Sequence, residues 1–203
     1  PHRTILEIGA GDGSVIQELC EIHFGSELYA VEISDSGIQT IRQRQIQSLL
    51  ECGLYDGYSI PYEDDRFDVA IMSHVLEHVE YPRRLLYEAS RVAHVVFIEV
   101  PLLDNMRLSN DYQCDAVGHI NSYSPKTLRR EVQTCDLEVL SQIVTNPSWR
   151  EYKYSGGWKT LPRYFAKAAA VRMLPHLAPY FWTYHSALTC RRRGREAVAP
   201  ERS

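Results

Sequence analysis

A glycine-rich turn between an apolar segment and a helical pattern constrains this chain more than any other feature. The turn, residues 9–13 (GAGDG), follows an apolar run at residues 4–8. Glycine lets the backbone turn tightly and lets a ligand approach without a Cβ clash, so a strand, this turn and a helix typically open a nucleotide-binding α/β domain. The spacing is G-x-G-x-G, with Ser14 where the third glycine of a dinucleotide fingerprint (G-x-G-x-x-G) would fall.

Strand-like and helical segments alternate along the rest of the chain. Strands are predicted at residues 4–8, 27–33, 53–55, 67–73, 94–100, 137–144 and 181–191. Helices are predicted at residues 13–23, 35–50, 77–93 with a restart at Pro82, 124–134 and 161–174. This alternation predicts an α/β fold with a doubly wound, mostly parallel sheet and helices on both faces. Ligands of such sheets bind at the carboxyl ends of the strands, so the residues after each strand matter most.

The bulk properties exclude several classes of protein. The 203 residues, of which 44% are hydrophobic and 24% charged, are enough for one domain with a sizeable core. We expect that domain to span residues 1–191, with a substrate-side insertion at 145–180 and a flexible tail at 192–203. The net charge of −4 carries no basic excess, so nucleic acid is not an expected partner.

Cysteine usage and hydropathy bear on the cellular compartment. The five cysteines are scattered and form no C-x-x-C pair, so neither a disulfide framework nor a zinc site is expected and a reducing, cytoplasmic location is favoured. The most apolar stretch, residues 164–188, is interrupted by charged residues and prolines, so no membrane span is predicted. A homodimer is compatible with the sequence. The chain begins almost on its first strand, which suggests a missing upstream segment.

Glu32 ends the second predicted strand, about twenty residues after the glycine turn. A carboxylate at that place can accept hydrogen bonds from both hydroxyls of a ribose. Its alternative role is that of a solvated charge at a strand end. Together with the turn, Glu32 predicts an adenosine-containing ligand, and on this evidence alone NAD remains among the candidates.

A further segment, residues 56–79 (DGYSIPYEDDRFDVAIMSHVLEHV), narrows the choice among adenosine-containing ligands. It resembles the class I S-adenosylmethionine-dependent methyltransferases, in the small-molecule branch that carries the VLEHV motif. The EIGAGDG turn is similar to the first motif of that family, Glu32 to its ribose-binding acid, and residues 118–139 to the segment before its final strands. The resemblance covers residues 5 to about 144. It implies a Rossmann-like sheet of about seven mostly parallel strands, the last one antiparallel, and S-adenosylmethionine as cofactor with S-adenosylhomocysteine as product.

The resemblance also implies roles for individual residues. The implied cofactor-binding residues are Glu7, Gly9, Gly11, Glu32, Ile33, Asp56, Gly57, Ser73 and His74. Glu7 would support the methionine portion, Asp56 would take the adenine amino group, and Ser73 with His74 would border the methionine head. S-adenosylmethionine has a sulfonium and an ammonium but no phosphate, so a glycine turn preceded by an acid suits it better than it suits a dinucleotide.

Methyl transfer to a hydroxyl or an ammonium is helped by a base, and histidine is the natural one near neutral pH. His119 lies in the long segment after the fifth strand, over the presumed acceptor site, and His74 directly follows the fourth strand. We predict these two as the catalytic residues. For Glu77 and His78 we favour a structural role at the start of the following helix.

A metal ion was considered at the same motif. Ubiquinone-biosynthesis O-methyltransferases resemble this segment with E-x-x-E-H, whose side chains can hold a divalent ion. Here His74 replaces the first glutamate, and carboxylates at helix starts are common without metal, so no metal site is predicted.

The sequence indicates least about the acceptor molecule. Aromatic residues between positions 149 and 182 can wall an apolar or ring-bearing acceptor, or can pack the last helix onto the sheet. The leading hypothesis is a methyltransferase acting on an oxygen or nitrogen atom of a small molecule. The alternatives are a catalytically silent module that binds the cofactor beside a partner protein, and an NAD(P)-dependent oxidoreductase.

Overall fold

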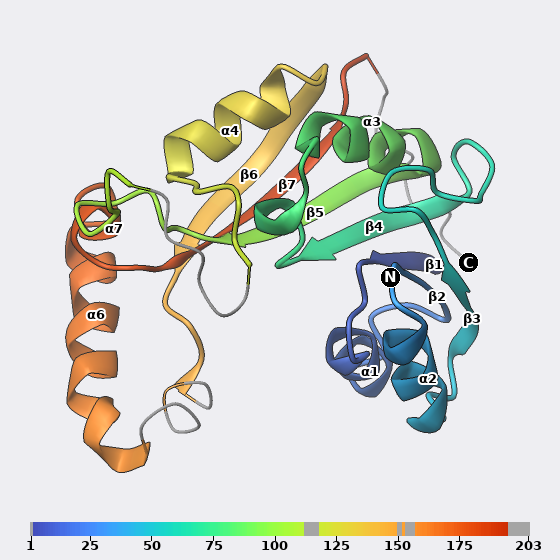
Figure 1. Cartoon of the computed structure of the whole chain (residues 1–203), viewed down its shortest axis with the longest axis horizontal. Coiled ribbons are helices and arrows are strands. Elements are labelled where there is room, and N and C mark those ends of the chain that lie inside the picture. The colour runs from blue at the N-terminus through green and yellow to red at the C-terminus, as the bar shows by residue number, and fades with distance from the viewer. Residues whose placement is uncertain (1, 112–117, 150–151, 153–156, 195–203) are drawn as a thin grey trace.

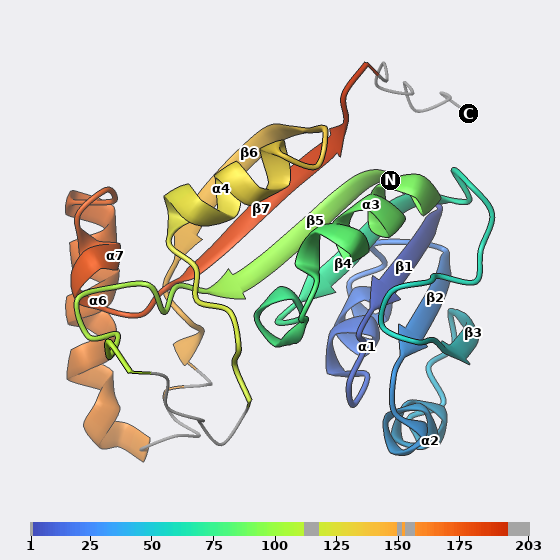
Figure 2. The ribbon, with the colours of Figure 1, turned by 45° about the horizontal axis from the view of Figure 1, so that its top comes forward.

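The computed structural model describes residues 2–111, 118–149, 152 and 157–194. Its strands are β1 (Thr4–Ile8), β2 (Glu27–Glu32), β3 (Leu49–Leu54), β4 (Phe67–Ser73), β5 (Ala93–Pro101), β6 (Leu137–Thr145) and β7 (His185–Arg192). They form one seven-stranded sheet in the order β3-β2-β1-β4-β5-β7-β6 (Figures 1 and 2). Strands β1 to β5 pair in parallel, and β7 lies antiparallel between β5 and β6. The expected mostly parallel sheet with an antiparallel last strand is confirmed.

Helices cover both faces of this sheet. They are α1 (Ser14–Glu21), α2 (Asp35–Gln43), the short η1 (Leu76–His78), α3 (Pro82–Val92), α4 (Pro125–Gln133), η2 (Gly157–Thr160), α6 (Leu161–Met173) and α7 (Ala178–Phe181). Successive residues of β1 point to opposite faces: Ile5 packs with Ile16 of α1, whereas Leu6 belongs to the cluster that contains Leu85 of α3. Because both faces are covered, all five residues of β1 are buried, which agrees with its mostly apolar sequence.

Three boundary predictions were wrong. The helix predicted at 35–50 ends at Gln43, and β3 begins at Leu49 instead of residue 53. Gln45 has a φ of 52°, which breaks the helix, and pairing with β2 then draws residues 49–54 into the sheet. The strand predicted at 181–191 begins at His185, because residues 178–181 form the single turn α7.

The predicted restart of the helix at Pro82 is confirmed. The helix after β4 divides into η1 and α3, and α3 starts at Pro82, whose fixed φ suits the first turn. The described parts of residues 102–124 contain no helix or strand. Arg192, expected in the tail, closes β7, while residues 195–203 lie outside the described part of the chain. Among the described helices, none is both long and apolar enough to cross a bilayer.

Candidate functional site

The glycine turn after β1 uses a left-handed backbone at three positions. Gly9, Gly11 and Gly13 have φ values of 71°, 55° and 81°, which other residues rarely adopt. The Gly9 amide donates to the carbonyl of Val31 over 2.8 Å, and a Cβ on Gly9 would come within 2.8 Å of Val75. A Cβ on Gly11 would meet no atom within 4 Å. Gly9 is therefore required for packing against η1, whereas Gly11 faces open space suited to a ligand.

Glu32 joins this turn to α2. Its Oε2 accepts a hydrogen bond from the Gly11 amide at 2.9 Å, and its Oε1 accepts from the amide and the hydroxyl of Ser34, each at 3.1 Å. Ser34 in turn caps α2 by accepting from the Gly37 amide. The carboxylate is thereby held at the ends of β1 and β2, and with about four acceptor positions it can take further donors such as ribose hydroxyls.

Glu7 is an acid buried beneath the turn. Burial raises the pKa of its carboxyl group to about 8, although a hydrogen bond from the Ile16 backbone opposes the shift. Its Oε2 has no hydrogen-bond partner within the described part of the chain. A buried acid with an unsatisfied oxygen is the group to expect beside a cation, because a positive charge would restore the ionised form.

Ile33, Asp56 and Gly57 gather at the ends of β2 and β3. The Ile33 side chain is 62% exposed although its neighbours in β2 are buried. A Cβ on Gly57 (φ 88°) would lie 3.8 Å from the Ile33 side chain. Asp56 is exposed and accepts bonds from the amides of Tyr58 and Ser59, which lower the pKa of its carboxyl group. This arrangement offers an apolar surface beside an ionised acid, which suits a planar base with an exocyclic amine.

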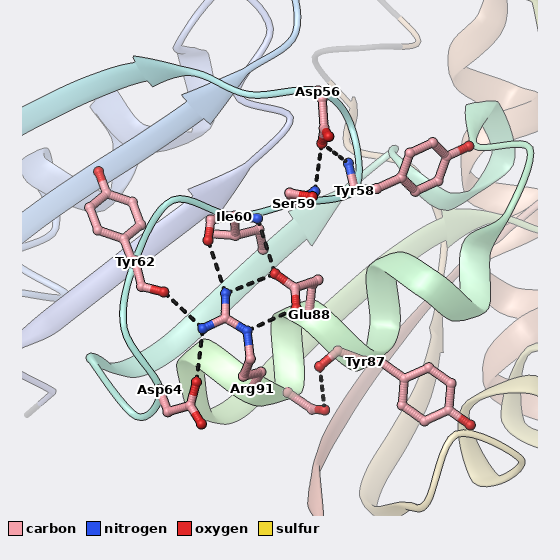
Figure 3. A network of polar contacts seen from close by, with 10 residues as sticks. Asp56, Tyr58, Ser59, Ile60, Tyr62, Asp64, Tyr87, Glu88 and Arg91 are labelled. Atoms are coloured by element: carbon pink, nitrogen blue, oxygen red, sulfur yellow. Dashed lines mark hydrogen bonds and ion pairs between the residues drawn. The ribbon is translucent and has the colours of Figure 1, made fainter.

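Arg91 of α3 holds the loop that follows Asp56 (Figure 3). Its guanidinium donates to the carbonyls of Ile60 and Tyr62 at 2.9 and 2.8 Å, and to the carboxylates of Asp64 and Glu88. Glu88 also accepts from the Ile60 amide at 3.1 Å. The Arg91 hydrogen bond lowers the pKa of the Glu88 carboxyl group. One side chain of α3 thus fixes the backbone of the loop on which Asp56 stands.

His74 follows β4 with a φ of 57°, an uncommon value for a residue with a side chain. Its amide donates to the carbonyl of Glu99 at 2.9 Å. Its Nδ1 lies 3.1 Å from Oε1 of Glu77, and its ring meets the ring of His185 edge to face at 4.7 Å. The turn therefore directs His74 toward the ends of β5 and β7, away from the neighbouring strand β1.

The Glu99 carboxylate lies between Ser73 and His185. Oε2 accepts from the Ser73 hydroxyl and Oε1 lies near Nδ1 of His185, both at 3.1 Å. The hydrogen bond with His185 lowers the pKa of the Glu99 carboxyl group despite its partial burial. Sequence reasoning missed Glu99 and His185. The signal for Glu99 was an acid inside the apolar run HVVFIEV, but nothing local in the sequence pairs it with a histidine 86 residues later.

His119 lies beside η1. The amides of Ile120 and Asn121 both donate to the carbonyl of Glu77, and the rings of His119 and His78 stack at 4.9 Å. Glu77 is fully buried, and its Oε2 has no hydrogen-bond partner among the described residues. The two histidines predicted as catalytic, His74 and His119, are therefore both brought to the carboxyl end of β4, on either side of Glu77.

Some aromatic side chains between β6 and β7 are buried in the packing, and others are exposed to solvent. Tyr184 is fully buried and its hydroxyl donates to the carbonyl of Lys167 at 2.9 Å, whereas Phe165 and Tyr180 are exposed. Lys167 is buried too, donates to the carbonyl of Thr183, and has its pKa lowered to about 8 by burial. Some of these rings thus anchor α6 to β7, and others remain available for contacts.

Comparison with known proteins gives a matching family model and curated relatives. The model of a family described as a methyltransferase domain matches residues 1–142. The mitochondrial ubiquinone biosynthesis O-methyltransferase of Candida albicans is 30% identical over 90 residues, which are 42% of this chain and 27% of that protein. A second curated relative, a 37.1 kDa uncharacterized protein of a Streptomyces fradiae transposon, is 23% identical over 202 residues. The chain spans 27% and 58% of the lengths of these two relatives.

Solved structures share the fold at low identity. The cyclase SpnF superposes with a TM-score of 0.67 and 19% identity, over 94% of this chain and 75% of that one. Phosphoethanolamine N-methyltransferase 2 of Haemonchus contortus, solved with S-adenosylmethionine, gives a TM-score of 0.66 and 11% identity, over 94% of this chain and 49% of that one.

Proposed function

This chain belongs to the methyltransferase domain family, and on that premise we propose that it transfers a methyl group from S-adenosylmethionine to an oxygen or nitrogen atom of a small-molecule acceptor. The observation that carries the proposal is the position of Glu32, buried and held by the Gly11 amide at the junction of β1, β2 and α2. A carboxylate there can bind both ribose hydroxyls of an adenosine.

The residues present fit this cofactor. The unsatisfied oxygen of buried Glu7 suits its cationic methionine portion, and the open face of Gly11 admits it. Ile33 and Asp56 suit its adenine. Gly9, Gly57, Ser73 and His74 complete the set that we assign to it. When bound, S-adenosylmethionine supplies an already activated methyl group, and the protein then has to hold the acceptor in line with it and exclude water.

For proton removal from the acceptor we propose His119 and His74. Both lie at the carboxyl end of β4, where the methionine end of the cofactor would also lie. His74 is held by Glu77, which orients its ring as a base requires. The segment at 145–180 is proposed to contribute to the acceptor site, within a domain that extends to residue 191.

We also propose a cytoplasmic location, since the four described cysteines are all unpaired. Fold alone does not assign methyl transfer, because one solved structure with this fold is described as a cyclase. A module that binds the cofactor without catalysis is therefore the second candidate function.

Calorimetric titration with S-adenosylhomocysteine, beside NADH, tests the proposal. We expect the nucleoside product to bind and NADH not to bind. Glu32→Ala should weaken binding by about 10- to 100-fold, the loss typical of hydrogen bonds to a charged group. Glu27→Ala, at the opposite end of β2, is the matched control and should leave the affinity unchanged.

NADH binding in place of S-adenosylhomocysteine would refute the assignment. A screen for transfer of labelled methyl to hydroxyl and amine acceptors then separates an enzyme from a silent module.

A further inference from the structure

Three side chains that are far apart in the sequence meet at one edge of the sheet. His74 follows β4, Glu99 lies near the end of β5, and His185 begins β7. Because β7 is antiparallel, its first residue reaches the edge at which β4 and β5 end. Backbone pairing fixes the three in register, with Glu99 opposite Ser73 and His185 opposite Pro101. Two members of the group therefore stand on strands, and the third directly follows one.

The spacing of this group fits a metal ion. One ligand atom from each of the three residues lies within 4.8 Å of the others. Oε1 of Glu99 and Nδ1 of His185 are 3.1 Å apart. Two ligands bound to one ion at about 2.0–2.2 Å, at a roughly tetrahedral angle, lie a little over 3 Å from each other. Only small side-chain adjustments would bring all three onto one ion.

The surrounding contacts are those that orient metal ligands. One ring nitrogen of His74 is held by Glu77, a fully buried carboxylate, at 3.1 Å. The Ser73 hydroxyl holds the second oxygen of Glu99. Histidines that bind metal commonly donate their other ring N–H to a carboxylate, which fixes the tautomer and the ring direction. His74 also keeps a left-handed backbone, which is uncommon for a residue with a side chain, at the same place.

We propose that His74, Glu99 and His185 bind one divalent transition-metal ion. Two imidazoles and one carboxylate favour ions such as Zn²⁺, Co²⁺, Mn²⁺ or Fe²⁺ over Mg²⁺ and Ca²⁺. Three protein ligands leave coordination positions open. With the ion bound, both ring nitrogens of His74 are engaged, so proton removal falls to His119. The site lies at the acceptor side of the cofactor, so the ion would bind an acceptor oxygen and lower the pKa of its hydroxyl. This last step rests on the proposed function and narrows the acceptor to an oxygen nucleophile.

A second group of potential ligands lies nearby, formed by Glu77, His78 and His119. Its two imidazoles stack with an interplanar angle of 29°, so the lone pairs in their ring planes run nearly parallel and do not converge. The rings of His74 and His185 cross at 76°, which lets their nitrogens point to a common position. Nδ1 of His78 also faces the carbonyl of Gly118. The geometry therefore favours His74, Glu99 and His185 over Glu77, His78 and His119 as a metal site.

The test is metal binding by the full chain after chelator treatment and dialysis. Titration with Zn²⁺, followed by calorimetry, should give one equivalent, and Co²⁺ should give the visible absorption bands of a nitrogen- and oxygen-ligated ion. Glu99→Gln and His185→Asn should each weaken the ion's Kd by more than about 100-fold, and Glu77→Gln by about 10- to 100-fold, the range for residues that orient ligands. Circular dichroism and S-adenosylhomocysteine titration verify that each variant folds.

Two controls make the outcome specific. His94→Asn changes a histidine near Asp65 at the other end of β5 and should leave metal binding intact. His78→Asn should also leave it intact. Loss of binding in His78→Asn with retention in His185→Asn would overturn the proposal, as would no binding by the unaltered chain. Since S-adenosylhomocysteine is titrated separately, a protein that binds metal but not this nucleoside would refute the proposed function and leave the metal site standing.

Discussion

Oε2 of Glu32 accepts a hydrogen bond from the amide of Gly11 at 2.9 Å, so the acid at the end of β2 and the glycine turn after β1 form a single unit. Neither the acid that we propose binds ribose nor the turn can move alone. Gly37, in the first turn of α2, fits closely against this unit. A Cβ there would come within 2.8 Å of the Glu32 side chain, the Gly11 carbonyl and the Ser34 hydroxyl.

Gly37→Ala should therefore disturb the unit formed by Glu32 and the glycine turn, although Gly37 is not one of the proposed cofactor-binding residues. Alanine favours a helix, yet here its methyl would displace three neighbours at once. We expect a loss of about 1–3 kcal/mol in the free energy of unfolding and about 10-fold weaker binding of S-adenosylhomocysteine. Chemical denaturation and calorimetry measure the two quantities. Gly53→Ala is the matched control, since its Cβ would meet no atom within 4 Å; equal effects in both variants would contradict the role of the Glu32 unit.

Ile33→Asp tests the adenine contact. Ile33 and Ile22 are both 62% exposed, but only Ile33 lies beside Gly57 and Glu32. An exposed position tolerates the change, so stability should shift by less than about 0.5 kcal/mol. Loss of the apolar contact, together with a new negative charge, should weaken S-adenosylhomocysteine binding by at least about 10-fold. Ile22→Asp should leave the affinity unchanged, and a similar loss in that variant would exclude a specific contact.

Glu7→Gln tests the buried acid through pH. The folded-state pKa of about 8 lies above the ordinary value of 4.5, so the folded protein holds a proton that the unfolded chain releases between these values. The stability of the unaltered protein should therefore fall as pH rises from about 4.5 to about 8. Glutamine resembles the protonated acid, so its stability advantage should grow over this range, by about 4 kcal/mol. Thermal unfolding at several pH values measures it.

The control for this prediction is Glu18→Gln, which makes the same substitution at an exposed position of α1 and so separates the effect of burial from that of the substitution itself. A pH-independent difference between Glu7→Gln and the unaltered protein would show that Glu7 is ionised throughout the range.

Arg91→Lys tests the support of the loop that carries Asp56. Lysine keeps the charge but cannot reproduce the planar fork that reaches two carbonyls and two carboxylates. We expect a loss of about 1–3 kcal/mol in stability. Hydrogen exchange should become faster at the Ile60 amide, which Glu88 holds. Arg83→Lys, on an exposed position of the same helix, should change neither. Unchanged exchange in Arg91→Lys would show that other contacts hold the loop.

Local patterns determined the strands, the glycine turn and the acid at Glu32, whereas the other candidate cofactor residues came from the family resemblance. Apolar runs such as residues 67–73 identify buried strands, because only a sheet covered on both faces hides a continuous apolar segment. Glycines with positive φ and an acid at the next strand end are signals carried within about thirty residues of chain. The antiparallel last strand followed from the family resemblance. Boundaries were less accurate where a single residue such as Gln45 left the helical region.

Tertiary structure alone decided which residues meet at the carboxyl ends of β4 and β5. Glu99 and His185 are contacts only because β7 enters the sheet antiparallel beside β5, with a register that no local pattern encodes. The same holds for His119, which reaches His78 because Ile120 and Asn121 donate to the carbonyl of Glu77. Side-chain periodicity records which face of a strand is buried, but it carries no information about which distant strand lies alongside, since that choice depends on the packing of the whole sheet.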